Sequence, residues 1–114
     1  MSKSWVELIV EREAQLGVDT LGRMAKIFIQ DSKNQLNTID TALGRNELAT
    51  ARSAAHDLVA NAGALGFIIL EDAARDCETA CINGDHAKAL GFYKHLPGLV
   101  NICVVQLRDR YKLT

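Results

Sequence analysis

Apolar residues recur at three- and four-residue intervals along most of this chain, the spacing that places them on one face of an α-helix. No polar–apolar alternation lasts long enough to predict a β-strand, and the chain holds one proline. Short segments containing glycine or asparagine separate the periodic stretches, which forces neighbouring helices to run antiparallel. We therefore expect an all-α fold, an up-down antiparallel four-helix bundle with a short additional N-terminal helix.

The whole chain, residues 1–114, is expected to form a single domain. This length suits one hydrophobic core, and 48% of the residues are apolar, which is too many for a disordered chain. Ser4 and Glu7 form a capping box, which predicts the N-terminal helix over residues 4–16. This helix is expected to lie across the bundle. Its expected contacts are Trp5, Leu8 and Ile9.

Capping residues set the expected limits of the first two bundle helices. Asp19 is expected to cap a long helix, which Gly44 should end in a left-handed C-terminal turn. Asn46 is expected to cap the next helix, and the two glycines within residues 63–66 should loosen or end it.

Two further helices complete the predicted bundle. One is expected over about residues 67–82, followed by a turn and a new cap at residues 83–85. The last is expected over about residues 86–112, with Pro97 in its middle. Proline lacks a backbone donor and clashes with the preceding turn, so this last helix should contain a kink or a brief break.

His56 lies on the second bundle helix, away from the apolar stripe of that helix. The stripe consists of Leu48, Ala51, Ala55, Leu58 and Ala62. At about 100° per residue, His56 lies roughly 130° from the centre of this stripe, so its imidazole should project into solvent. Its neighbours on the helix surface are mostly small, which leaves a titratable side chain open to the active site of another protein.

The other reactive side chains are expected to have structural roles. Cys77, Cys81 and Cys103 fall on apolar stripes and should be small buried hydrophobic residues. His86 is expected to be exposed at a helix start, and His95 to be exposed just ahead of the kink at Pro97. No glutamate has a histidine three residues later, which argues against a metal–carboxylate bundle.

Charge and hydropathy argue against two classes of partner. The formal net charge is −1, from 13 basic and 14 acidic side chains, so the chain lacks the basic field of a nucleic-acid-binding protein. No apolar run approaches the roughly 20 residues that span a bilayer. Charged residues stand near the N-terminus, where a signal peptide would carry an apolar core. We expect a cytoplasmic protein that binds neither nucleic acid nor membrane.

The pattern Ala55-His56-Asp57-Leu58, followed by Leu65-Gly66, Glu78 and Gly84-Asp85, resembles the histidine-containing phosphotransfer (Hpt) domain of two-component phosphorelays. The resemblance covers about residues 19–112. It implies that His56 accepts a phosphoryl group from an aspartyl phosphate on a receiver domain and passes it to another receiver. The chain would then be a phosphocarrier, without the ATP site of a kinase, rather than a free-standing enzyme.

The same resemblance implies the partners and cofactors. The partners are response-regulator receiver domains and a hybrid sensor kinase, and the protein itself is expected to be a monomer. It is expected to need no cofactor or metal of its own, because the partner receiver domain binds the Mg²⁺ that phosphoryl transfer requires.

The chain departs from the family pattern just after the histidine. The lysine that the family carries three residues after the histidine is Val59 here, and the glycine that follows it is Ala60. That lysine would stabilise the phosphoryl oxygens. Arg52, one turn before His56 on the same side, is a candidate for supplying the charge; the alternative is an ordinary solvated arginine.

Further residues are candidates for supporting the histidine or for docking a partner. Ser53 and Asn61 are polar and are candidates for hydrogen bonds to the imidazole or the partner, although ordinary surface roles fit them as well. The expected apolar docking rim, in which Val59 should be about half-buried, comprises Ala49, Val59, Ala60, Gly63 and Ala64.

Two alternative functions remain open. Without the lysine, the chain is also compatible with a degenerate Hpt-like module that docks a receiver or kinase and regulates it without carrying phosphate. The other alternative is a helical dimer that uses the bundle only as a scaffold.

Overall fold

The computed structural model describes residues 3–113, and this part of the chain contains six α-helices and no β-strand. The prediction of an all-α fold is confirmed. The helices are α1 (Trp5–Leu16), α2 (Val18–Gly44), α3 (Leu48–Ala64), α4 (Ile68–Ile82), α5 (His86–Tyr93) and α6 (Leu96–Tyr111). Within the described segment, none of the helices combines the length and the apolar character needed to cross a bilayer.

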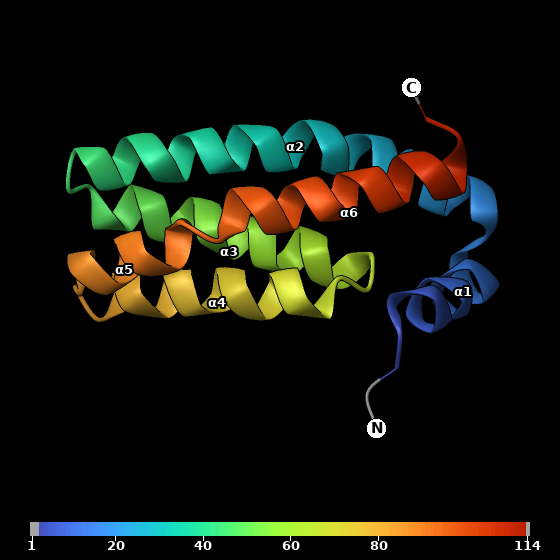
Figure 1. The fold of residues 1–114 in the computed structure, drawn as a ribbon, viewed down its shortest axis with the longest axis horizontal. Coiled ribbons are helices and arrows are strands. Elements are labelled where there is room, and N and C mark those ends of the chain that lie inside the picture. Colours follow the sequence, from blue (N-terminus) through green and yellow to red (C-terminus); the bar gives the residue numbers. More distant parts are fainter. Residues whose placement is uncertain (1–2, 114) are drawn as a thin grey trace.

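Helices α2, α3 and α4 and the α5–α6 pair lie side by side along the longest axis of the molecule (Figure 1), which measures 41 × 33 × 20 Å. Short connections at residues 45–47, 65–67 and 83–85 turn the chain back at the ends of the bundle. Helix α3 packs against both α2 and α4. It is therefore held on two sides, and its outer face carries exposed side chains.

The packing of α3 depends on small side chains. Its buried residues are Ala51, Ala54, Ala55, Leu58, Val59 and Ala62. Because most of these are alanines, the backbones of the neighbouring helices can approach α3 closely. Larger buried side chains come from the helices around it, among them Leu21, Phe28, Leu43, Leu70 and Leu107.

Helix α1 closes the end of the bundle where α3 is followed by α4 (Figure 1). The indole of Trp5 stacks on Phe67 with ring centroids 5.1 Å apart, and its Nε1–H donates to the carbonyl of Leu65 at 2.9 Å. Ile9 is fully buried, and Leu8 is half-buried at the same junction. The expected contacts of α1 with the bundle are confirmed.

Three expected helix limits are wrong. Helix α2 begins at Val18 after Gly17, so Asp19 lies in its first turn instead of capping it; a carboxylate there still interacts favourably with the helix dipole. Gly44 is the last residue of α2, and the left-handed conformation falls at Asn46, with φ 56°. Asn46 therefore forms the turn and does not cap α3. Asparagine suits such a turn because it tolerates the left-handed conformation.

The segment expected to form one last helix, kinked or briefly broken at Pro97, forms two helices, and the break falls before Pro97. Helices α5 and α6 are separated by Lys94 and His95. Pro97 lies in the first turn of α6, where a backbone N–H would have no partner within the helix and where its fixed φ suits the helical conformation.

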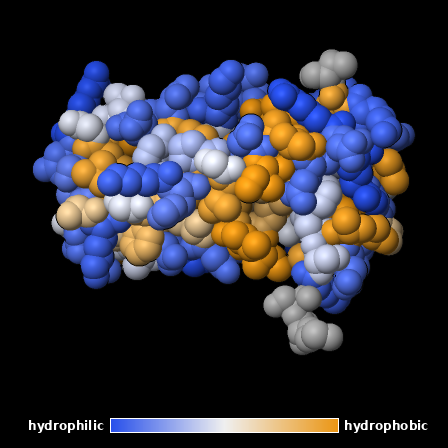
Figure 2. Space-filling view, in the orientation of Figure 1, coloured by the Kyte–Doolittle hydropathy of each residue, from blue (hydrophilic) through white to orange (hydrophobic). Residues whose placement is uncertain are grey.

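An apolar groove of about 300 Å³ lies between α1, the start of α4 and α6. Its lining includes Trp5, Ile68, Ile69, Leu99 and Ile102. Figure 2 shows apolar side chains gathered on this face of the molecule.

Glu13 of α1 joins α6 through Arg110 and Tyr111. The guanidinium of Arg110 donates two hydrogen bonds to the Glu13 carboxylate, at 2.6 and 2.9 Å, and the Tyr111 hydroxyl donates a third at 2.7 Å. The bonds from Arg110 and Tyr111, with the charge of Arg110, hold the pKa of Glu13 below its ordinary value although burial opposes them. The α1–α6 contact is therefore stabilised by an ionised carboxylate.

We predict that Gly66→Ala destabilises the fold by about 1–2 kcal/mol. Gly66 has φ +78°, and an added Cβ would lie 3.0 Å from the Cβ of Leu8. The matched control is Gly91→Ala in α5, where an added Cβ meets no atom within 4 Å, so helix propensity should leave stability unchanged or raise it by up to about 1 kcal/mol. Urea unfolding measures both, and equal stabilities of the two variants would contradict the prediction.

We predict that Glu13→Gln weakens the pH dependence of stability. Because the folded pKa of Glu13 lies below its unfolded value, its contribution is present above the unfolded pKa, near pH 4.5, and is lost as the pH falls through the folded pKa. Urea unfolding at about pH 6 should show a loss of about 1–2 kcal/mol in the variant, shrinking towards about pH 3. Glu11→Gln, on the exposed face of α1, is the control. Stability curves of wild type and Glu13→Gln that run parallel in this range would refute the role.

Candidate functional site

His56 projects from the outer face of α3, and 68% of its side chain is exposed. Ala55 and Leu58 on the same helix are fully buried, so the packing of α3 sets the direction in which the imidazole points. The predicted exposure of His56 is confirmed. A reactive side chain on a packed helix is held more precisely than one on a loop.

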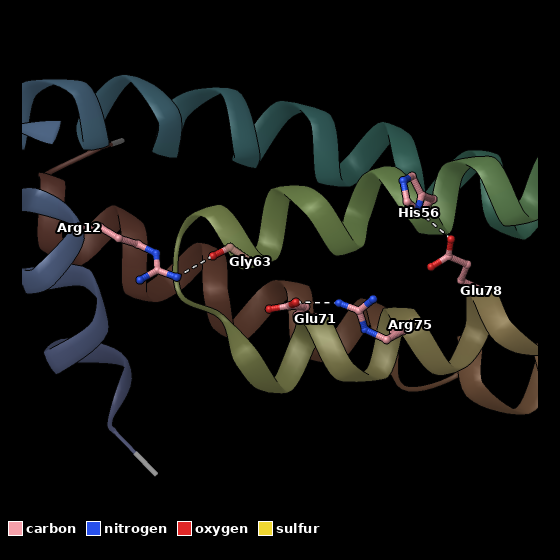
Figure 3. Close-up of polar contacts among 6 residues, drawn as sticks. All are labelled: Arg12, His56, Gly63, Glu71, Arg75 and Glu78. Carbon is pink, nitrogen blue, oxygen red and sulfur yellow. Dashed lines mark hydrogen bonds and ion pairs between the residues drawn. The ribbon is translucent and has the colours of Figure 1, made fainter. Parts of the chain in front are cut away.

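The imidazole is oriented by a carboxylate from the neighbouring helix. Nδ1 of His56 lies 2.7 Å from Oε2 of Glu78 in α4, and only 12% of the Glu78 side chain is exposed (Figure 3). An ionised carboxylate only accepts hydrogen bonds, so Nδ1 carries the hydrogen and donates it. In the neutral ring the lone pair is then on Nε2. The hydrogen bond to Glu78 favours one tautomer of the imidazole, and in this tautomer Nε2 is the nucleophilic nitrogen.

Sequence reasoning assigned no role to Glu78. The contact joins residues 22 positions apart on different helices, and such a pair has no local spacing pattern. Its place in the family pattern was the only signal that could have identified it.

Most of the expected neighbours of His56 lie on the exposed face of α3. Ala49, Arg52, Ser53 and Ala60 are exposed, and Gly63 is half-buried. Apart from Arg52 these side chains are small, and they leave space for a second protein to approach Nε2. Their part in docking stays a prediction.

Two expected neighbours lie elsewhere. Val59 is 6% exposed, so the expectation of a half-buried side chain is wrong: it packs into the core and offers little area to a partner. Asn61 is half-buried in a shallow hollow that Met24 and Ile27 of α2 also line, on the side of α3 nearer α2. Within residues 3–113, neither Ser53 nor Asn61 hydrogen-bonds the imidazole, whose partner is Glu78.

Charged residues of α4 form a row beside α3 that the sequence reasoning did not anticipate. Glu71, Arg75 and Glu78 follow one another at four- and three-residue spacing, which places them on one helix face. Arg75 donates to Glu71 at 2.8 Å (Figure 3). Glu71 also lies close to α3, because a Cβ added at Gly63 would be 3.0 Å from its Oε1.

Arg52 lies at the other end of the site. It is exposed and lines a shallow recess with Ala49 of α3 and with Cys81 and Ile82 of α4. This position is one helical turn before His56, as expected from the sequence. Whether it supplies charge to a phosphoryl group stays a prediction.

The cysteines are buried, as expected. Burial raises the pKa of Cys77 and that of Cys103 to about 12, and it also raises the pKa of Cys81. Such thiols are protonated at neutral pH and are poor nucleophiles. In the described part of the chain, no three His, Cys, Asp or Glu side chains are grouped so that they could hold a metal ion.

The other two histidines differ from each other. His95 is exposed, as expected. The expectation of an exposed His86 is wrong, because its ring is half-buried and its Nε2–H donates to the carbonyl of Leu43 at 2.7 Å. This bond joins the start of α5 to the end of α2, so His86 has a structural role.

We predict that Glu78 sets the tautomer of His56. In Glu78→Ala the bias towards Nδ1–H should fall by about fivefold, the effect of losing a hydrogen bond worth about 1 kcal/mol. Glu78→Gln is the matched control, because its amide oxygen still accepts from Nδ1. Nitrogen chemical shifts of the imidazole measure the tautomer ratio, and an unchanged ratio in Glu78→Ala would show that Glu78 does not set it.

The comparisons with known proteins agree with this geometry. The family model of the Hpt domain matches residues 23–109, which include His56 and Glu78. Searches of curated proteins and of solved structures gave no match. Hpt domains act in histidine phosphotransfer within phosphorelays and interact with receiver domains and kinases. The match spans well over half of the chain, from α2 to α6. The chain therefore belongs to the Hpt domain family.

Proposed function

We propose that His56 accepts a phosphoryl group from the aspartyl phosphate of a receiver domain and passes it to a second receiver. The observation that carries this proposal is the arrangement of the imidazole: Nδ1 is held by Glu78, and the exposed ring has Nε2 as its free nitrogen. Family membership supports the reaction class, and the contact of Nδ1 with Glu78 supports Nε2 as the reacting atom.

In the forward step the Nε2 lone pair attacks phosphorus, and the Nε2–P bond forms. The bond between phosphorus and the aspartyl oxygen breaks, and the departing carboxylate keeps the electron pair. The neutral ring thereby becomes a phosphorylated imidazolium that still carries its Nδ1 hydrogen. Glu78 accepts that hydrogen bond at 2.7 Å and faces the new positive charge, which strengthens the interaction.

The same proton makes the second transfer possible. When the aspartate of the next receiver attacks phosphorus, the Nε2–P bond breaks and the electron pair returns to Nε2. Because Nδ1 has kept its hydrogen, the ring departs as neutral imidazole, a better leaving group than an imidazole anion. Glu78 thus supports transfer in both directions.

The partners divide the work between them. Phosphoryl transfer depends mainly on in-line positioning and on charge stabilisation. The receiver contributes the Mg²⁺ and a lysine of its own, and this protein contributes a positioned nucleophile. We expect a monomeric cytoplasmic carrier that serves a hybrid sensor kinase and response regulators.

The alternative function is that of a docking module that does not carry phosphate. The specific observation in its favour is Val59, a buried apolar side chain in the sequence position where the family has a lysine. Such a module would bind a receiver through the outer face of α3 and regulate it without accepting phosphate.

We predict that a receiver carrying ³²P-aspartyl phosphate, incubated with this protein and Mg²⁺, transfers acid-labile label to it. His56→Gln should reduce the label to background, because it removes the nucleophilic nitrogen. The matched control is His95→Gln, which removes another exposed histidine and should leave labelling unchanged.

The outcomes separate the two functions. Label that persists in His56→Gln would overturn the assignment of His56. If several receivers bind the protein and none transfers label, the docking module is the correct function.

A further inference from the structure

We propose that Arg75 of α4 supplies the positive charge that stabilises phosphorylated His56, in place of the lysine that this chain lacks at position 59. The proposal deepens the proposed function and rests on it for the phosphorylation of His56. It requires a cation that can reach the phosphoryl group, and the packing of α3 on α4 places Arg75 on the helix that also holds Glu78.

The register between α3 and α4 locates Arg75. His56 contacts Glu78 at one point, and Gly63 lies against Glu71 at another. Both intervals are seven residues, or two helical turns. The midpoint of the α4 interval is therefore the Ala74–Arg75 pair, and the midpoint of the α3 interval is Val59 and its successor. The two midpoints lie opposite each other.

Of the two α4 residues at this midpoint, only the arginine reaches the surface. Ala74 is fully buried, whereas 54% of the Arg75 side chain is exposed. Figure 3 shows Arg75 between Glu71 and Glu78, beside the turn of α3 that follows His56. Arg75 thus lies across from the site of the missing lysine.

The present partner of Arg75 is easily exchanged. Its bond to Glu71 is an exposed pair four residues apart on one helix, and solvent screens such pairs so that they contribute little to stability. A phosphoryl dianion offers a guanidinium shorter, charge-assisted and bidentate hydrogen bonds. Phosphorylation of His56 should therefore draw the guanidinium from Glu71 to the phosphoryl oxygens.

Arg52 is the competing cation, and its surroundings differ. It lies one turn before His56, beside Ile82 at the end of α4, whereas the missing lysine would follow His56. The two arginines therefore lie on opposite sides of the imidazole along α3, and substituting each in turn distinguishes them.

The test uses phosphoramidate, a small phosphoryl donor that requires no receiver. The bond between nitrogen and phosphorus in the donor breaks, ammonia leaves, and the Nε2–P bond forms. A ³¹P NMR titration then measures the second pKa of the phosphoryl group, and His56→Gln identifies which signal belongs to His56. A nearby cation stabilises the dianion and lowers this pKa.

We predict that Arg75→Ala raises the pKa of the phosphoryl group by about 0.5, as expected for an exposed ion pair, and shortens the lifetime of the phosphohistidine. Arg75→Lys should keep most of the effect. Glu71→Gln should lower the pKa further, because it removes the competing partner of Arg75. Arg52→Ala is the matched control and should leave the pKa unchanged; the effect of Arg75 should shrink in about 1 M salt.

Each outcome decides between the possibilities. An unchanged pKa in both Arg75→Ala and Glu71→Gln would overturn the role of Arg75, and a rise in Arg52→Ala alone would assign it to Arg52. If Arg75→Ala unfolds, as urea unfolding would reveal, Glu71→Gln and Arg75→Lys still decide. Failure of all receivers to exchange phosphate, with the pKa effect intact, would overturn the proposed function alone. If phosphoramidate cannot label His56, both proposals fall.

Discussion

The burial of the alanine-rich side of α3 between α2 and α4 is the constraint on which the site depends. Ala51, Ala55 and Ala62 are fully buried there, and their small side chains allow both neighbours to pack closely. A helix held in this way cannot rotate about its own axis without exposing apolar area. The outward direction of His56 is therefore a property of the core, although its imidazole contacts very little of that core.

Close packing also brings α4 within hydrogen-bonding distance of the reactive ring. Glu78 is mostly buried at the α3–α4 contact, yet one carboxylate oxygen reaches Nδ1 of His56. One hydrogen bond then has two consequences. It places the free lone pair on Nε2, and under the proposed function it would keep on the ring the proton that makes a phosphorylated histidine a good donor. The hydrogen bond between His56 and Glu78 therefore bears both on how the ring attacks phosphorus and on how it leaves.

The helix ends support this arrangement from a distance. Arg12 of α1 donates to the carbonyls of Gly63 and Ala64 at 3.1 Å each, so a side chain of α1 binds two carbonyls at the end of α3. At the opposite end of the bundle, the last turn of α2 is joined to the start of α5 by the bond from His86 to Leu43. The reactive histidine lies between these two fixed ends and needs no loop to position it.

The sequence alone determined the helical class, the exposure of His56 and the family, because apolar periodicity and a local motif depend on residues close together in the chain. It misplaced the turn at Asn46, since glycine and asparagine both suit a left-handed residue and only the packing of α3 on α2 decides between them. Val59 was expected at the edge of the stripe, but two neighbouring helices bury a wider arc of α3 than one apolar stripe suggests. Only the tertiary structure brought Glu78 to His56 and the Glu71–Arg75 pair alongside α3, because the register between two packed helices is set by the interlocking of their side chains and not by any spacing along the chain.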